Sequence, residues 1–142
     1  MSSTILIVEP ERDLSAPLEF ALRRAGLMTC LAEDGEAALQ LAAAMPTSAL
    51  VLLDLMLPDM SGFDVCQQLR ADDRTSSLPI VMTSSRVEEI CRFTAAACGV
   101  DDFVTKPFSL RALTSRCLEL LRRGRCEPSR RWFECGPMSP SP

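Results

Sequence analysis

The chain has no histidine and no tyrosine among its 142 residues. Without an imidazole there is no Ser-His-Asp triad, no histidine ligand for zinc and no histidine that carries a phosphoryl group. Lysine is also scarce, because Lys106 is the single lysine among 15 basic residues. A reactive site in this chain would therefore work without an imidazole.

Long hydrophobic runs are absent as well. Apolar stretches such as residues 49–53 are far shorter than the roughly 20 residues that cross a bilayer. The first four residues include no basic side chain and the next apolar run stops at Glu9, so we expect no signal peptide and a cytoplasmic protein. A hydrophobic content of 47% and a mean hydropathy of +0.13 predict one ordinary globular core.

Seven cysteines are many for this length, but the number is odd and no two form a C-x-x-C pair. Four of them fall in segments with helical periodicity, namely Cys66, Cys91, Cys98 and Cys117. We expect them to be small buried side chains in a reducing compartment rather than metal ligands or disulfides.

Short apolar runs alternate with segments of helical periodicity five times. The predicted strands cover residues 4–8, 27–31, 49–53, 79–83 and 102–104. This alternation predicts an α/β domain with a doubly wound, five-stranded parallel sheet that helices cover on both faces. One predicted helix, rich in alanine and cysteine, runs to Gly99.

Several residues mark where the helices begin and end. Asp34 and Ser109 are predicted N-cap residues, and Gly26 follows the first helix as a stop signal. Pro17 is compatible with the first helix only within its first turn, so we expect that helix to begin no earlier than Asp13.

The alternating pattern ends at residue 124. Residues 1–123 are therefore predicted to form one domain, and residues 124–142, which are rich in proline and lack periodicity, to be a flexible tail or a truncated linker. The net charge of −4 is concentrated outside this tail, so we expect no direct binding of nucleic acid by the domain.

Four chemically useful side chains follow predicted strands. Glu9, Asp54, Ser84 and Lys106 come at the ends of the first, third, fourth and fifth strands. Because the carboxyl ends of parallel strands form the ligand-binding edge of a doubly wound sheet, these groups are expected to meet there. An ammonium acts as a point charge toward a carboxylate or phosphate. Pro107 is compatible with a cis peptide bond that would aim Lys106 inward.

The order of these segments resembles a response-regulator receiver domain of a bacterial two-component system over residues 4–123. Four segments carry the resemblance: residues 5–9, 53–62, 79–82 and 99–108. It implies a flavodoxin-like (β/α)5 fold with strand order 2-1-3-4-5. It also implies a signalling switch rather than an enzyme.

The resemblance assigns roles in phosphorylation to individual residues. Asp54 matches the family's phosphoacceptor, which a sensor histidine kinase or phosphotransfer protein phosphorylates. Ser84 matches the hydroxyl that hydrogen-bonds the phosphoryl group, and Lys106 the lysine that pairs with it. Phe103 matches the aromatic switch residue that turns inward when the hydroxyl moves. The signal would pass to a downstream effector protein or to an output domain beyond this chain.

The same resemblance implies a Mg²⁺ site made by Glu9, Asp54 and the main-chain carbonyl of Met56. The family normally has two successive acids after the first strand, whereas here Pro10 follows Glu9. Since Mg²⁺ prefers oxygen ligands in near-octahedral geometry, loss of a carboxylate predicts weaker binding. Glu11 is a substitute ligand to consider, as is Asp13.

Two functions remain open at this stage. One is a phosphorylation-dependent switch with a weakened metal site, which the joint presence of Asp54, Ser84, Phe103 and Lys106 favours. The other is a receiver-like interaction module that acts independently of phosphorylation because of Pro10.

Two other classes of protein fit the sequence less well. A flavodoxin-like redox protein would have a loop rich in glycine, serine and threonine after its first strand, and this chain has Glu9-Pro10-Glu11-Arg12 there. A phosphatase with an aspartyl nucleophile would have a second aspartate at residue 56, which is methionine.

A homodimer face is a further implication of the resemblance, through the last two helices and the fifth strand. Residues that resemble part of its charged set are Arg92, Asp101, Asp102, Arg116 and Arg123. Ala112 stands where a glutamate is usual, so we expect at most a weak homodimer.

Overall fold

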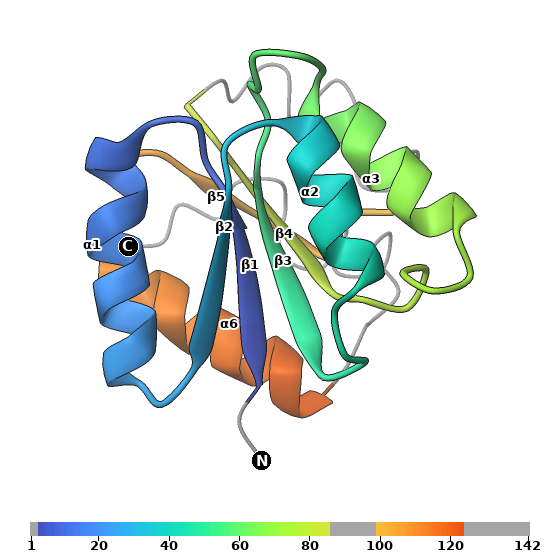
Figure 1. Ribbon diagram of the computed structural model, residues 1–142. Helices are drawn as coiled ribbons and strands as arrows, with labels where there is room; N and C mark the ends of the chain where they lie inside the picture. Colours follow the sequence, from blue (N-terminus) through green and yellow to red (C-terminus); the bar gives the residue numbers. More distant parts are fainter. Residues whose placement is uncertain (1–2, 86–98, 124–142) are drawn as a thin grey trace.

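The computed structural model describes residues 3–85 and 99–123, and Figure 1 shows how their helices and strands are arranged. The elements are β1 (Thr4–Val8), α1 (Arg12–Arg24), β2 (Met28–Ala32), α2 (Gly35–Ala43), β3 (Ala49–Asp54), α3 (Gly62–Ala71), β4 (Ile80–Ser84), β5 (Asp102–Thr105) and α6 (Leu110–Arg123).

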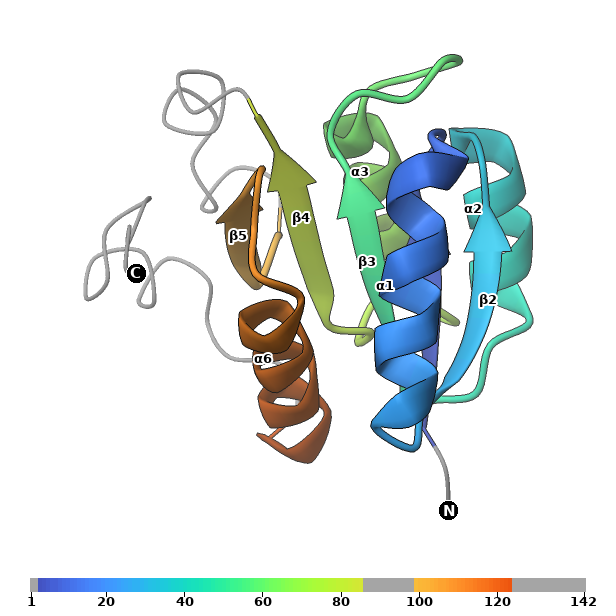
Figure 2. The ribbon, with the colours of Figure 1, turned by 90° about the vertical axis from the view of Figure 1, so that its left-hand side faces the viewer.

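The five strands form one parallel sheet in the order β2-β1-β3-β4-β5. The first strand therefore lies inside the sheet, and the chain winds outward from it in both directions. This confirms the predicted doubly wound α/β fold and its strand order. All strands end at the same edge of the sheet, which Figure 2 shows at the top.

Alternate residues of the central strands face two separate cores. In β1, Leu6 and Val8 point to the core formed with α2 and α3, while Ile5 and Ile7 point to the core formed with α1 and α6. The two pairs of helices lie on opposite faces of the sheet (Figure 2). Because both faces are covered, the central strands are almost entirely apolar, as buried parallel strands require.

The predicted element ends agree with the structure in most places. Asp34 caps α2 by accepting from the N–H of Ala37 at 2.8 Å, and Ser109 caps α6 through the N–H of Ala112 at 3.2 Å. Gly26 follows α1 with a φ of +92°, in the left-handed region that favours glycine.

The expectation for Pro17 was wrong. Helix α1 begins at Arg12, one residue earlier than predicted, and Pro17 lies inside it, beyond the first turn. Proline leaves the carbonyl four residues before it, that of Asp13, without a helical partner, but Asp13 is exposed to water. Burial of Leu18 and Leu22 on the other side of the helix compensates for the lost hydrogen bond.

Cys66 and Cys117 are buried thiols, as predicted. Burial, with a smaller contribution from Asp102, raises the pKa of the Cys117 thiol to about 12. The predictions for the helix up to residue 98, which includes Cys91 and Cys98, and for the tail 124–142 lie outside the described residues. Within residues 3–85 and 99–123, none of the helices combines the length and apolar character needed to span a membrane.

Candidate functional site

Three charged side chains meet at the carboxyl edge of the sheet. Glu9 follows β1, Asp54 is the last residue of β3, and Lys106 follows β5. The Nζ atom of Lys106 lies 3.0 Å from Oε1 of Glu9 and 3.4 Å from Oδ1 of Asp54. Both carboxylates are buried, with only 4% of Glu9 and 6% of Asp54 exposed. The structure thus brings together three of the four predicted strand-end groups, namely two carboxylates and the Lys106 ammonium.

Burial and a neighbouring charge raise the pKa of the Asp54 carboxyl group above its usual 3.8. Loss of hydration is the larger cause, and the negative charge of Glu9 acts in the same direction. The Lys106 ammonium and a hydrogen bond from the N–H of Met56 oppose the increase. Asp54 is therefore a poorly solvated carboxylate whose charge is only partly balanced.

Backbone hydrogen bonds fix the positions from which these side chains project. The N–H of Glu9 donates to Ala32 at 3.0 Å, and the N–H of Lys106 donates to the carbonyl of Ser84 at 2.9 Å. The sheet hydrogen bonding thus continues past the strand ends. The Lys106–Pro107 peptide bond is cis, as the sequence analysis considered.

Gly62 is part of the site's framework, and the sequence analysis assigned it no role. A Cβ atom at this position would lie 2.6 Å from the carbonyl oxygen of Asp54 and 2.9 Å from Cα of Leu55. Only glycine permits α3 to begin this close to the end of β3. The Ser61-Gly62 pair before a helical segment was the available signal, since Ser61 caps α3 in a capping box with Asp64.

Ser84 and Phe103, the two predicted switch residues, lie on β4 and β5. Ser84 ends β4, the strand next to β3, and is 1% exposed. Phe103 is buried in β5, and its ring meets that of Phe63 edge to face, with 6.3 Å between centroids. Ser84 was predicted at the carboxyl edge of the sheet, whereas no local pattern predicted Phe63 as the neighbour of Phe103.

The oxygen donors near Asp54 are fewer than in a site with two successive acids. Pro10 contributes no carboxylate, and the side chains of Glu11 and Asp13 are exposed at the start of α1. Among residues 3–85 and 99–123, no group of three or more His, Cys, Asp or Glu side chains is placed to hold a metal. Two carboxylates and the Met56 carbonyl are nevertheless hard oxygen donors of the kind Mg²⁺ prefers.

One residue of the predicted dimer face is not at the surface. Asp101 is 1% exposed and its Oδ2 accepts from Nη2 of Arg70 at 3.0 Å and from the N–H of Ile80 at 2.8 Å. The prediction that Asp101 belongs to that face was therefore wrong, because this carboxylate joins α3 to the start of β4. Asp102 pairs with Arg116 of the same chain at 3.0 Å. Arg92 lies outside the described residues.

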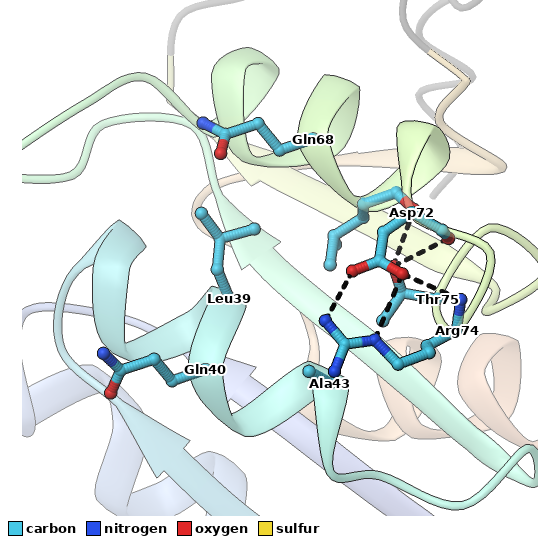
Figure 3. A pocket seen from close by; sticks show the side chains of 8 residues that line it. Leu39, Gln40, Ala43, Gln68, Asp72, Arg74 and Thr75 are labelled. Carbon is cyan, nitrogen blue, oxygen red and sulfur yellow. Dashed lines mark hydrogen bonds and ion pairs between the residues drawn. The ribbon is translucent and has the colours of Figure 1, made fainter.

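A separate surface hollow lies between the C-terminal halves of α2 and α3, at the end of the sheet opposite Asp54 (Figure 3). Its charged side chains, Asp72 and Arg74, pair with each other at 2.9 Å. The hydroxyl of Thr75 donates to the carbonyl of Leu69 at 2.7 Å. These polar groups already satisfy one another, so the hollow is not a competing candidate for the functional site.

Fold and site together define a doubly wound α/β domain with a buried carboxylate and a paired lysine at its carboxyl edge. Residues 5–118 match the family described as the response regulator receiver domain, and the chain belongs to this family. The family assignment decides against the flavodoxin-like redox protein and the aspartyl phosphatase considered above.

Individual relatives and solved structures agree with this assignment. The sensory transduction protein RegX3 of Mycobacterium tuberculosis is 47% identical over 122 residues, which cover 86% of this chain and 52% of that protein. The chain thus spans about half the length of such curated relatives.

Two solved structures show the same fold. A two-component response regulator from Clostridium difficile has a TM-score of 0.75 and 26% identity, covering 87% of this chain and 98% of that chain. The receiver domain of the sensor histidine kinase PA1611 from Pseudomonas aeruginosa has a TM-score of 0.77 and 24% identity, covering 86% and 99%. The PA1611 receiver domain holds a coordinated magnesium ion in its active-site cleft.

Proposed function

We propose that the domain is a signalling switch that accepts a phosphoryl group on Asp54 from a sensor histidine kinase or phosphotransfer protein. The arrangement of Asp54 and Glu9 around Lys106 carries this proposal. A carboxylate oxygen of Asp54 attacks phosphorus, the phosphorus–nitrogen bond of a donor phosphohistidine breaks, and the donor imidazole takes up a proton. Phosphoryl transfer depends mainly on positioning and charge neutralisation, and Lys106 contributes to both.

Ser84 and Phe103 act as the response to phosphorylation in this proposal. Ser84 ends the strand beside β3, where its hydroxyl group can hydrogen-bond a phosphoryl oxygen on Asp54. Phe103 is the register partner of Met82, two residues before Ser84, so a movement at the end of β4 would reach its ring along that strand. The altered β4–β5 surface would then be recognised by an effector or by an output domain.

Glu9, Asp54 and the Met56 carbonyl are the proposed Mg²⁺ ligands. The ion would neutralise charge on the phosphoryl oxygens, and water would complete its coordination. We expect affinity to be lower than in a receiver with two successive acids, because Pro10 replaces a ligand. The magnesium ion in the PA1611 receiver domain supports a metal at the equivalent edge of the fold.

The proposed organisation is a receiver domain at residues 1–123, with residues 124–142 as a flexible tail or truncated linker. The chain spans about half the length of its curated relatives, and we propose that the signal passes either to a separate effector protein or to an output domain. We also propose a cytoplasmic location, no direct binding of nucleic acid by this domain, and a weak homodimer through β5 and the last two helices. The intrachain Asp102–Arg116 pair would compete with dimer contacts.

The test is phosphorylation by acetyl phosphate in Mg²⁺, followed by intact mass, for the wild type, Asp54→Asn and Pro10→Asp. We expect the wild type to gain one phosphoryl group and Asp54→Asn to gain none. Pro10→Asp should be phosphorylated at a Mg²⁺ concentration at least about 10-fold lower than the wild type needs. Reaction of Pro10→Asp alone would identify the native chain as a phosphorylation-independent interaction module. Reaction of neither, with beryllofluoride also failing to bind, would overturn the proposal.

A further inference from the structure

Asp59 lies in the loop between β3 and α3, yet it binds the first turn of α2. Its Oδ1 accepts from the N–H of Gly35 at 2.8 Å, and its Oδ2 accepts from the N–H of Glu36 at 3.0 Å. The loop and the first turn of α2 both lie at the end of the sheet that carries Asp54 (Figure 1). One exposed carboxylate therefore connects the loop that follows the phosphoacceptor strand to a neighbouring helix.

The N-terminus of α2 is capped from two sides. The first N–H groups of a helix have no partner within it. The side chain of Asp34 serves one of them by accepting from the N–H of Ala37. Asp59 serves two more, those of Gly35 and Glu36. The hydrogen bond from Gly35 is the main reason that the pKa of Asp59 lies below its usual range, and the carboxylate also faces the positive end of the helix dipole.

Met60 brings the tip of the loop into direct contact with α2. A Cβ atom at Gly35 would lie 2.5 Å from Cγ and 2.7 Å from Sδ of Met60. The close approach is possible because residue 35 has no side chain. Two consecutive loop residues, Asp59 and Met60, therefore hold the tip on the same turn of helix.

The other end of the loop is closed against Asp54. The N–H of Gly62 donates to the carbonyl of Leu55 at 2.7 Å, and Met56 and Ser61 form an antiparallel bridge. The main-chain N–H of Met56 is the smallest of the influences on the pKa of Asp54, which it lowers. Because the loop is closed at its base and anchored at its tip, displacement of the tip changes the position of the Met56 main chain.

We infer that Asp59 is a positioning residue that holds the main chain of Met56 against Asp54 by anchoring the loop on α2. The effect on the Met56 main chain rests on the geometry of the loop, which Asp59 anchors at its tip and the Met56–Ser61 bridge closes at its base. The effect on the Met56 carbonyl rests on the proposed function, in which that oxygen is a Mg²⁺ ligand. Since Mg²⁺ demands near-octahedral geometry, a loosened loop would lower its affinity.

The experiment compares Asp59→Ala with Asp34→Ala as a matched control. Each substitution removes a cap from the N-terminus of α2, but only Asp59 belongs to the loop. For both variants we would measure urea unfolding, hydrogen exchange of the Met56 amide, and Mg²⁺ binding by calorimetry. Asp59→Ala should speed Met56 exchange and weaken Mg²⁺ binding about 10-fold, whereas Asp34→Ala should leave both near wild type. The Asp59→Asn variant keeps one acceptor oxygen, so its Met56 exchange rate and Mg²⁺ affinity should lie between those of the wild type and Asp59→Ala.

The outcomes separate the inference from the proposed function. If Asp59→Ala and Asp34→Ala change the exchange rate of the Met56 amide equally, Asp59 only stabilises α2 and the inference is overturned. Unchanged Met56 exchange in Asp59→Ala would overturn it as well. Faster Met56 exchange in a chain whose wild type binds no Mg²⁺ would support the positioning role and contradict the proposed metal site.

Discussion

Lys106 and Glu9 form an ion pair of 3.0 Å between Nζ and Oε1, although they follow strands at different places in the sheet. β1 and β5 are not neighbours, because β3 and β4 lie between them. The lysine therefore reaches across the edge of the sheet and passes close to Asp54. The same ammonium lies next to two buried carboxylates, and several properties of the domain depend on it.

Replacement of Lys106 by methionine should destabilise the fold at neutral pH. The substitution keeps the apolar stem but leaves Glu9 and Asp54 facing each other without a cation, which raises the pKa of Asp54 further. We expect the free energy of unfolding to fall by about 1–3 kcal/mol, the usual effect of leaving buried polar groups unpaired. Urea unfolding at pH 7 and at acidic pH checks this, because the loss should shrink when the carboxylates are protonated. Equal losses at both pH values would contradict it.

Substitution of Asp54 by asparagine should stabilise the protein at neutral pH. Since the folded-state pKa of Asp54 lies above 3.8, the native state binds the proton more tightly than the unfolded state, and wild-type stability falls as pH rises through this interval. Asparagine removes this dependence. The stability advantage of Asp54→Asn over the wild type should be near zero below pH 3.8. It should grow as pH rises and reach a plateau of about 1.4 kcal/mol for each unit by which the folded-state pKa of Asp54 exceeds 3.8.

Unfolding curves of the Asp54→Asn variant and the wild type over a series of pH values measure this difference. A variant that is less stable than the wild type at neutral pH would show that Asp54 gains more from Lys106 and the Met56 N–H than it loses by burial.

Gly62→Ala should damage both stability and the site. The added Cβ would meet the carbonyl oxygen of Asp54 at 2.6 Å, so the start of α3 must move away from β3. We expect a loss of about 1–3 kcal/mol together with weaker beryllofluoride binding. Gly26→Ala is the control, because a Cβ there meets nothing within 4 Å although φ is +92°. It should cost about 1–2 kcal/mol and leave beryllofluoride binding unchanged.

Arg70 and Arg74 both form ion pairs, but their removal should have different effects. Arg70 bonds Asp101 and the carbonyls of Gly99, Ser76 and Leu78, all within an interior network. Arg70→Ala should cost about 3–5 kcal/mol, because the buried Asp101 carboxylate loses the guanidinium that pairs with it. Arg74→Ala removes an exposed pair and should cost less than about 1 kcal/mol.

Chemical denaturation of the Arg70→Ala and Arg74→Ala variants under the same conditions tests this contrast. If both variants lose only a small and similar amount of unfolding free energy, the interior role of Arg70 is contradicted.

Much of the fold followed from local patterns in the sequence. The β-branched run at residues 4–8 and the apolar run at residues 49–53 identified strands buried on both faces, and the observed strands differ from prediction by a residue or less at these positions. Asp34 and Ser109 were identifiable as caps because a cap depends only on its own helix. The expected meeting of Asp54 with Lys106 followed from sheet topology alone.

The departures all involve contacts between distant segments. Pro17 looked incompatible with a helix interior, but burial of the opposite face of α1 outweighs one lost hydrogen bond. Asp101, just before β5, looked like a surface charge beside Asp102, yet it is buried and pairs with Arg70 of α3. No local pattern distinguishes these neighbouring aspartates.

The sequence by itself determined the strands, the helix caps and the set of groups at the carboxyl edge, because these depend on residues close together in the chain. Only the tertiary structure decided how the groups pair: Lys106 with Glu9 across two intervening strands, Asp59 with the first turn of α2, and Gly62 against the carbonyl of Asp54. Ion pairs and close approaches depend on differences of a few tenths of an ångström between segments, and those distances are set by packing of the whole sheet and its helices.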